Sequence, residues 1–194
     1  MRLFKDYIFI CILISTAFVS QKCKEDSPIP KPKSYLRIDY PLKEYNFISN
    51  NCPYSFMIPN YSIWIKKFKE APNCYKTLIF PNFKAELICS YKKIDSNFFE
   101  LTESLRSNAY EHSFKANAII EESWKNDEKQ VYGYTYKIKG NVACNYMFYI
   151  TDSLNHFFSG ELLFQVRPNY DSLQPSILFI EEDIKKLIES FEWK

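Results

Sequence analysis

The sequence predicts an α+β fold in which two helices pack on an antiparallel sheet. Several runs alternate apolar and polar residues with a period of two, which is typical of strands with one buried face. Two longer segments repeat apolar residues every three or four positions, as a helix with one buried stripe does. Because three of the strand-like runs follow one another directly between the helices, an antiparallel sheet is favoured.

Short strands and turns are expected in the first part of the domain. This part contains Pro41, Pro53, Pro59, Pro72 and Pro81. Proline has no backbone N–H to donate, so it favours sheet edges, strand ends and turns. A clear strand then follows, because Ala85, Leu87, Cys89 and Tyr91 alternate with polar residues.

A helix is predicted over residues 97–115, with Ser96 or Asn97 as its N-terminal cap. Its apolar stripe consists of Phe98, Leu101, Leu105, Ala109, His112 and Ala116. The pair Glu121–Glu122 that follows is interpreted as a solvated turn.

Three strands are predicted next, and a second helix closes the chain. The three strand faces are Tyr132, Tyr134, Tyr136 and Ile138; then Val142, Cys144, Tyr146, Phe148 and Ile150; then Phe158, Leu162, Phe164 and Val166. Residues 151–155 read as the hairpin loop between the last two strands. The closing helix is expected over residues 175–191, with the stripe Ile177, Ile180, Ile184, Leu187, Ile188 and Phe191.

The N-terminus has the pattern of an export signal. Arg2 and Lys5 precede a run of apolar residues from Tyr7 to Val19 that contains no charge. The run is shorter than the ~20 residues of a membrane-spanning helix but suits a signal peptide. Residues 1–22 are therefore predicted to be a signal peptide.

Cys23 follows this run closely and is the predicted site of lipid attachment. Lys22 precedes it, where a lipoprotein signal usually has a small residue, so cleavage after Ala17 or an uncleaved anchor are the alternatives. Residues 24–34 contain three prolines and few apolar side chains, which favours a stiff, extended tether. Residues 35–194 then form a single globular domain.

Composition excludes several classes of function. The chain has only three glycines, which stand apart, and this argues against a glycine-rich phosphate loop. Residues 1–22 hold three of the 25 basic and one of the 23 acidic residues, so the remainder has a formal net charge of zero. A neutral chain argues against binding to nucleic acid. The cluster Lys66–Lys69 is interpreted as one solvated strand or turn face.

Four cysteines remain beyond Cys23, and an even number in an exported protein favours disulfides. Cys52 and Cys74 both lie in the proline-rich part and form the candidate disulfide. Cys89 and Cys144 lie on apolar strand faces, where they either pair or stay free in the core. Close cysteine pairs are missing from the sequence and the histidines are few, so neither a metal nor another cofactor is predicted.

Only two histidines are available for catalysis, and both have a structural interpretation. His112 falls on an apolar helix stripe, and His156 ends a predicted hairpin. An enzyme is therefore not predicted. The alternative is a periplasmic ligand-binding domain or enzyme with a pocket near His156 or His112.

Short motifs spread over the chain resemble the gliding motility lipoprotein GldD family of Bacteroidota. The matching stretches are Cys23–Asp26, Lys31–Lys33, Leu36–Pro41, Cys52–Phe56, Phe80–Pro81, Ser90–Lys92, Val131–Gly133, Lys139–Asn141, Thr151–Ser153, His156–Phe157, Val166–Asn169 and Phe191–Lys194. The closing strands and helix also resemble PsbP-like α/β/α sandwich domains, which bears on the fold only.

The resemblance implies an envelope lipoprotein that is required for gliding motility and for the linked type IX protein secretion machinery. Its partners would be envelope proteins of those systems and, through a palmitate-type lipid anchor on Cys23, a membrane of the cell envelope. The resemblance implies no catalytic residues.

Overall fold

The structure is a computed structural model that describes residues 38–49 and 51–194. The predicted signal peptide, Cys23 and the proline-rich tether lie outside these residues. Within them, two antiparallel sheets and two long helices confirm the predicted α+β class.

A seven-stranded sheet forms the centre of the fold, with the order β3-β4-β5-β9-β8-β7-β6. Its strands are β3 (Ile63–Ile65), β4 (Lys76–Phe80), β5 (Ala85–Lys93), β6 (Ala116–Asn126), β7 (Val131–Gly140), β8 (Cys144–Thr151) and β9 (His156–Phe164). A short 3-10 helix, η1 (Pro81–Phe83), joins β4 to β5. All eight residues of β8 are buried, because this strand is covered on both faces.

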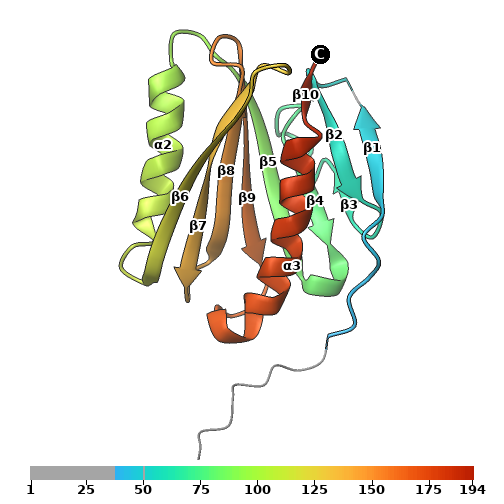
Figure 1. The fold of residues 1–194 in the computed structure, drawn as a ribbon, viewed down its shortest axis with the longest axis vertical. Helices are drawn as coiled ribbons and strands as arrows, with labels where there is room; N and C mark the ends of the chain where they lie inside the picture. The colour runs from blue at the N-terminus through green and yellow to red at the C-terminus, as the bar shows by residue number, and fades with distance from the viewer. Residues whose placement is uncertain (1–37, 50) are drawn as a thin grey trace, which may run out of the picture. The chain divides into compact units, whose positions relative to one another are not determined.

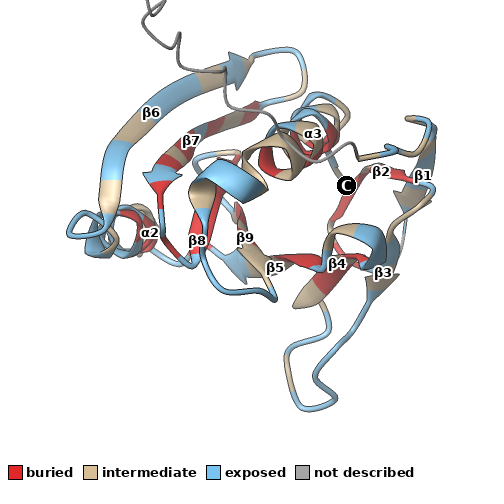
Figure 2. Cartoon of the chain, turned by 90° about the horizontal axis from the view of Figure 1, so that it is seen from below, coloured by how far each residue is buried: buried red, intermediate tan, exposed pale blue. Residues whose placement is uncertain are grey.

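A smaller sheet has the order β1-β2-β10, with β1 (Tyr45–Ser49), β2 (Tyr54–Pro59) and β10 (Glu192–Trp193). Helix α3 (Tyr170–Glu189) and this sheet cover one face of the large sheet, which curves around them in Figure 2. Helix α2 (Phe98–Glu111) packs on the opposite face, as Figure 1 shows.

Two hydrophobic clusters lie on the two faces of the large sheet. The first joins α3 and the small sheet to buried residues such as Phe148, Phe158 and Ile184. The second lies under α2 and includes Leu101, Leu105 and Tyr136. The centres of both predicted stripes are therefore the buried faces of their helices, whereas Ala116 and Phe191 lie outside the helices.

Several predicted boundaries were wrong. Helix α2 ends at Glu111, and residues 116–126 form strand β6, so Glu121–Glu122 lies in a strand rather than in a turn. Helix α3 begins at Tyr170 instead of Pro175, because the Asn169 side chain caps it by accepting from the backbone N–H of Ser172. Phe191 lies beyond the end of this helix.

The predicted common face of the Val142–Ile150 strand was also wrong. The pairing of β8 with β9 shifts register between Cys144 and Tyr146. Cys144 consequently faces the α2 cluster, whereas Tyr146 and Phe148 face the α3 cluster. An extra residue in one strand reverses the side of the sheet to which later side chains point.

Candidate functional site

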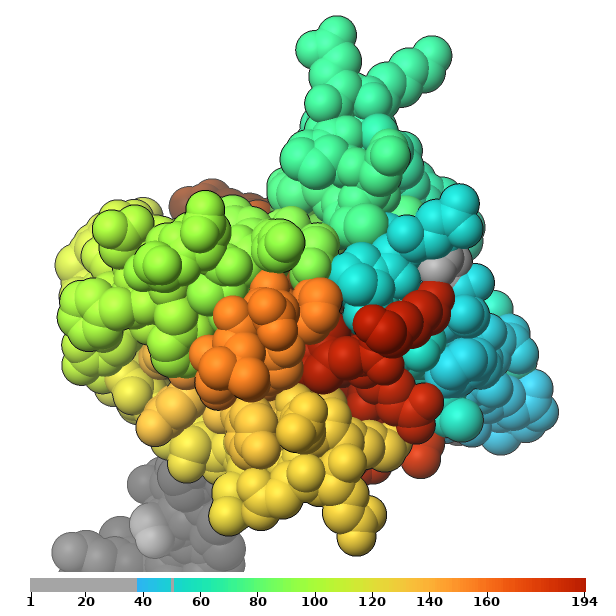
Figure 3. All heavy atoms as spheres, turned by 90° about the horizontal axis from the view of Figure 1, so that it is seen from above, coloured from blue at the N-terminus to red at the C-terminus, as the bar shows by residue number. Residues whose placement is uncertain are grey.

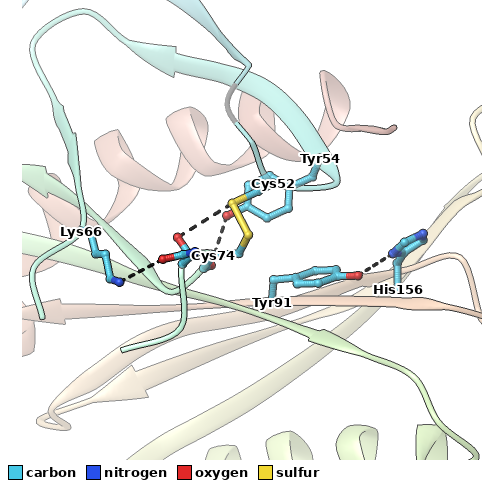
Figure 4. Close-up of a disulfide and its surroundings, with 7 residues drawn as sticks. Cys52, Tyr54, Lys66, Cys74, Tyr91 and His156 are labelled. Carbon is cyan, nitrogen blue, oxygen red and sulfur yellow. Dashed lines mark hydrogen bonds between the residues drawn. A yellow bond between two sulfur atoms is a disulfide. The ribbon is translucent and has the colours of Figure 1, made fainter. Parts of the chain in front are cut away.

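Cys52 and Cys74, the candidate disulfide pair, are joined by a disulfide in the structure (Figure 4). Cys52 lies between β1 and β2, and Cys74 lies in the segment of residues 66–75 that connects β3 to β4. The bond therefore fastens this connecting segment to the small sheet. The Tyr54 hydroxyl adds a hydrogen bond to the Cys74 carbonyl oxygen, at 3.2 Å. Figure 3 shows the same segment, in green, projecting from the body of the domain.

Cys89 and Cys144 are free and buried. They belong to the clusters on opposite faces of the large sheet, so they cannot pair with each other. Burial raises the pKa of the Cys89 thiol, and burial with the nearby Glu161 carboxylate raises that of Cys144 to about 12. Both side chains therefore stay protonated and act as small apolar groups in the core.

The two histidines do not form a common site. His156 forms a hydrogen bond of 2.7 Å through Nδ1 with the Tyr91 hydroxyl (Figure 4). Its ring also stacks on Trp193. His112 lies at the C-terminal end of α2, on the other face of the sheet, near Glu161. Neither histidine lines any of the three pockets described below.

A buried carboxylate in α3 holds the beginning of the described chain. Asp183 is only 1% exposed and accepts hydrogen bonds from the Lys43 ammonium (2.9 Å) and the Tyr45 hydroxyl (2.8 Å). The Tyr61 hydroxyl donates to its second oxygen. Lys43 also donates to the Phe179 carbonyl oxygen at 2.7 Å. We call these residues the Asp183 network.

The charges in this network are fixed by their surroundings. Burial, together with the Asp183 carboxylate, raises the pKa of the Tyr45 and Tyr61 hydroxyls. Both hydroxyls therefore stay protonated and serve as donors, and the Lys43 ammonium supplies the balancing positive charge. The buried Asp183 carboxylate accepts three hydrogen bonds from this network, and Lys43 has one further, exposed partner in Glu182, which suits structural fastening more than catalysis.

Three pockets surround strand β6, at one end of the large sheet. The largest, of about 480 Å³, lies on the α2 face and is lined mainly by Phe98, Ser123, Lys125, Tyr132, Tyr134 and Tyr149. Tyr134 and Tyr149 stack with ring centroids 5.8 Å apart. The hairpin between β8 and β9 closes one end of this pocket through Thr151 and Ser153. We call it the tyrosine pocket.

The two smaller pockets, each of about 250 Å³, continue around the same strand. One has the polar lining Thr102, Glu103, Arg106 and Glu121, and shares Tyr134 and Tyr149 with the tyrosine pocket. The other lies on the α3 face, between Trp124, Val131, Ile188 and Phe191. We call them the polar pocket and the tryptophan pocket.

Gly133 shapes this region. A Cβ atom at this position would collide with the Tyr149 carbonyl oxygen and with the ring of Trp124. The missing side chain lets the Trp124 ring lie directly over the neighbouring strand, against the α3 cluster.

Within residues 38–49 and 51–194, no group of three or more His, Cys, Asp or Glu side chains could hold a metal ion. In the same part of the chain, no helix is both long enough and apolar enough to cross a membrane.

A family model described as "Gliding motility lipoprotein GldD" matches residues 25–193. The chain belongs to this family. The predicted family is thereby confirmed, and the name of the GldD family indicates a lipoprotein of the cell envelope that serves gliding motility. None of the curated proteins matches the chain.

A solved structure of cyanobacterial PsbP from Synechocystis is similar to this GldD-family chain, with a TM-score of 0.48 and 13% sequence identity. The alignment covers 79% of this chain and 95% of that one.

Sequence reasoning missed both the Asp183 network and the pockets around β6. Asp183 follows Glu181 and Glu182 in a run that resembles a solvated helix face, although it lies one position before the buried Ile184. Its partners are more than 120 residues away in the sequence. The alternating tyrosines of β7 were a usable signal, because aromatic side chains on an outer strand often line a binding surface.

Proposed function

We propose that the protein is an envelope lipoprotein, anchored by lipid on Cys23, that serves gliding motility and the linked type IX secretion machinery through contacts with partner proteins. It acts without catalysis. The observation that carries this proposal is the family match, which begins at Glu25, directly beyond Cys23, and continues to residue 193.

Two features of the domain support a role in holding and contacting other proteins. The Asp183 network fixes Lys43 and Tyr45, close to where a tether would join the domain, to helix α3. An anchor attached through residues 24–34 would thus be joined to a firmly fastened part of the domain. The pockets around β6 supply the open surface that a partner requires.

Substitution Cys23→Ser in the native host tests the anchor. Several acyl chains give effectively permanent attachment, because each buried CH₂ contributes ~0.8 kcal/mol. The variant is expected to lose palmitate incorporation and to leave the membrane fraction. Separation of inner and outer membranes for the wild type assigns the membrane. Unchanged labelling, processing and fractionation of the variant would refute lipidation at Cys23 and favour cleavage after Ala17 or an uncleaved anchor.

The same variant tests the role in the cell. Gliding and the amount of type IX cargo in the medium are both expected to fall in Cys23→Ser cells that contain normal levels of the protein. Loss of gliding with full secretion would separate the two systems and contradict the proposed link.

The alternative, a ligand-binding or enzymatic pocket near His156 or His112, is tested by His112→Gln with His156→Gln. The contacts of both histidines are structural, so gliding and secretion are expected to persist in a stably produced double variant. Loss of both activities at unchanged protein level and partner binding would instead favour histidine chemistry.

A further inference from the structure

We propose that strand β6 is a docking edge, onto which an extended segment of a partner protein adds as a further strand of the large sheet. This inference deepens the proposed function, on which it rests, by assigning the surface and the chemistry of the contact.

Strand β6 is a long edge strand. It runs from Ala116 to Asn126 and, among the described residues, pairs only with β7. In an antiparallel ladder every second residue of an edge strand directs its N–H and C=O groups away from the sheet, where another strand can bind them. The opposite edge, β3, has only three residues. A short edge offers few such groups.

The three pockets flank this edge on both faces of the sheet. Ser123 and Lys125 line the tyrosine pocket on the α2 face, and Glu121 lines the polar pocket on the same face. Trp124 and Asn126 line the tryptophan pocket on the α3 face. Lys125 also reaches this pocket, and Trp124 also borders the tyrosine pocket, so the two pockets meet around the edge. Side chains of an added strand point alternately to the two faces, so successive residues of one segment would meet these pockets in turn.

The pocket linings define the chemistry of the segment. A side chain opposite Ser123 or Lys125 meets Phe98, Tyr132 and Tyr134, so an aromatic or aliphatic residue fits there. Its neighbour, opposite Trp124, meets Ile188 and Phe191 and is also apolar. The buried Trp124 indole N–H has no hydrogen-bond partner among the described residues. The residue of the added segment opposite Glu121, two positions away on the α2 face, would meet Arg106 and Glu103 and is therefore expected to be polar.

The charges of β6 disfavour a second copy of the same chain. The middle of the strand is Glu121–Glu122, whose side chains point to opposite faces, and antiparallel self-pairing centred on either residue would place two like carboxylates opposite each other on one face. Like charges opposite each other destabilise a pair of strands. A different segment that places a neutral or cationic residue opposite Glu121 and Glu122 avoids this repulsion. The occupant is therefore a partner protein.

Photo-crosslinking of the full chain in the native host tests the docking edge. A benzophenone-bearing residue replaces Glu121, Ser123 or Lys125 in turn, and mass spectrometry locates each crosslink in the captured protein. Paired strands advance together, so the three sites are expected to crosslink to one segment of one protein, at positions two residues apart. We call this regular series of crosslinks the crosslink ladder. The same benzophenone-bearing residue in place of Ser49, an exposed position on edge strand β1, is the control and should give no crosslink ladder.

A charged side chain at the mouth of the tyrosine pocket provides the matched substitution. Ser123→Arg is expected to lower the crosslink yield from position 125 about tenfold, as loss of a central contact does. Ser49→Arg makes the same change on the other sheet, away from the three pockets, and should leave the yield unchanged. Protein level and membrane fractionation should be equal in both variants.

Several outcomes overturn the docking edge. These are the lack of crosslinks from β6, crosslinks scattered over the captured protein, and crosslinks to residues 1–37 of the same chain, to a second copy, or to lipid or glycan. If Ser123→Arg abolishes the crosslink ladder but leaves gliding and secretion intact, the contact at β6 does not serve the proposed function, and the docking edge fails. If wild-type cells give the crosslink ladder but Cys23→Ser leaves gliding and secretion intact, the docking edge stands and the proposed function fails. If wild-type cells give no crosslink ladder although Cys23→Ser abolishes gliding and secretion, the proposed function stands and the docking edge fails.

Discussion

The two faces of the seven-stranded sheet are closed to different extents. On one face, α3 and the three-stranded sheet form a second complete layer, fastened by the Cys52–Cys74 disulfide and the Asp183 network. On the other face, α2 is the one element of residues 38–49 and 51–194 that covers β7 and β8. Beyond α2, the tyrosine pocket remains open on the side of β6, and Ile63 of β3 is 50% exposed on the opposite edge.

The closed α3 face is expected to stabilise the fold, and the open α2 face is expected to bind other molecules. Burial of apolar side chains and internally paired charges concentrate on the α3 face, so this face is expected to carry most of the free energy of folding. The α2 face keeps exposed aromatic side chains and an open edge strand, which cost stability but provide a contact surface. Four experiments test whether the two faces differ in this way.

The largest effect is expected from Asp183→Ala on the closed face. Removal of this carboxylate leaves two tyrosine hydroxyls without their acceptor. It also leaves the partly buried Lys43 ammonium with only the Phe179 carbonyl oxygen and the exposed Glu182 carboxylate. Breaking a buried ion pair in this way costs about 3–5 kcal/mol in the free energy of unfolding, measured by urea denaturation. The neighbouring Glu182→Ala is the control: this carboxylate also lies 3.2 Å from the Lys43 ammonium, but its side chain is 66% exposed, so its loss should lower the free energy of unfolding by less than ~0.5 kcal/mol. Equal effects would show that the network does not fasten the face.

A pair of cavity-forming substitutions compares the two helices directly. Ile184 of α3 is 1% exposed and Leu105 of α2 is 5% exposed. Truncation of either side chain to alanine is expected to lower the free energy of unfolding by ~2–5 kcal/mol. The loss is larger where the surrounding side chains cannot collapse into the cavity. Ile184→Ala should therefore be the more destabilising in urea denaturation. A cost of less than ~0.5 kcal/mol for Ile184→Ala would mean that α3 is peripheral.

The disulfide is expected to contribute about 3 kcal/mol, since it closes a loop of roughly 23 residues. The double variant Cys52→Ser with Cys74→Ser should unfold at a lower urea concentration than the wild type. Dithiothreitol should shift the wild type to the same midpoint and leave the double variant unchanged. Mass spectrometry of unreduced peptides checks the bond itself, and two free thiols in the exported protein would contradict it.

The smallest effect is expected at Asp152, in the hairpin that closes the tyrosine pocket on the open face. Burial acts to raise the pKa of Asp152, but the backbone N–H groups of His156, Asn155 and Leu154 donate to its Oδ1 and hold the pKa below its usual value. Asp152→Ala should cost about 1 kcal/mol at neutral pH, as removal of a capping side chain does.

The pH dependence of this effect has a definite sign. Because the folded-state pKa of Asp152 is lowered, the contribution of its charge is fully present above the unfolded value of ~4. This contribution is lost as the pH falls through the lowered pKa of Asp152 in the folded protein. The stability difference between the wild type and Asp152→Asn, which retains an acceptor oxygen, should therefore shrink on acidification. A difference that grew below pH ~4 would contradict the lowered pKa.

The elements that bury a regular stripe were predictable from the sequence, and those at the open edge were not. The spacing of Leu101, Leu105 and Ala109 predicts the buried face of α2 correctly, because only one side of that helix packs on the core. Strand β6 was missed because it is the last strand of the sheet and is partly solvated on both faces. Its adjacent glutamates, Glu121 and Glu122, point to opposite faces and interrupt the apolar alternation on which a strand prediction depends.

The candidate sites divide in a similar way. The Cys52–Cys74 pair could be proposed from chemistry and position in the chain, because few cysteines were available. The Asp183 network could not, since its partners Lys43, Tyr45 and Tyr61 approach only after β1, β3 and α3 have assembled. The tyrosine pocket likewise depends on the spatial neighbourhood of α2, β7 and the β8–β9 hairpin, which no local pattern specifies.

The Asp183 network also has a mechanical consequence. A force applied to the chain at Ile38 would meet the stack of Tyr40 on Phe179, with ring centroids 4.4 Å apart, and then the Lys43–Asp183 ion pair, before it reached β1. The load would thus pass into the body of α3. Strand β1 is an edge strand. If the force reached it directly, its hydrogen bonds to β2 could break one after another from one end. Tension on the N-terminal side of the domain would therefore load α3 and would not peel β1 away from β2.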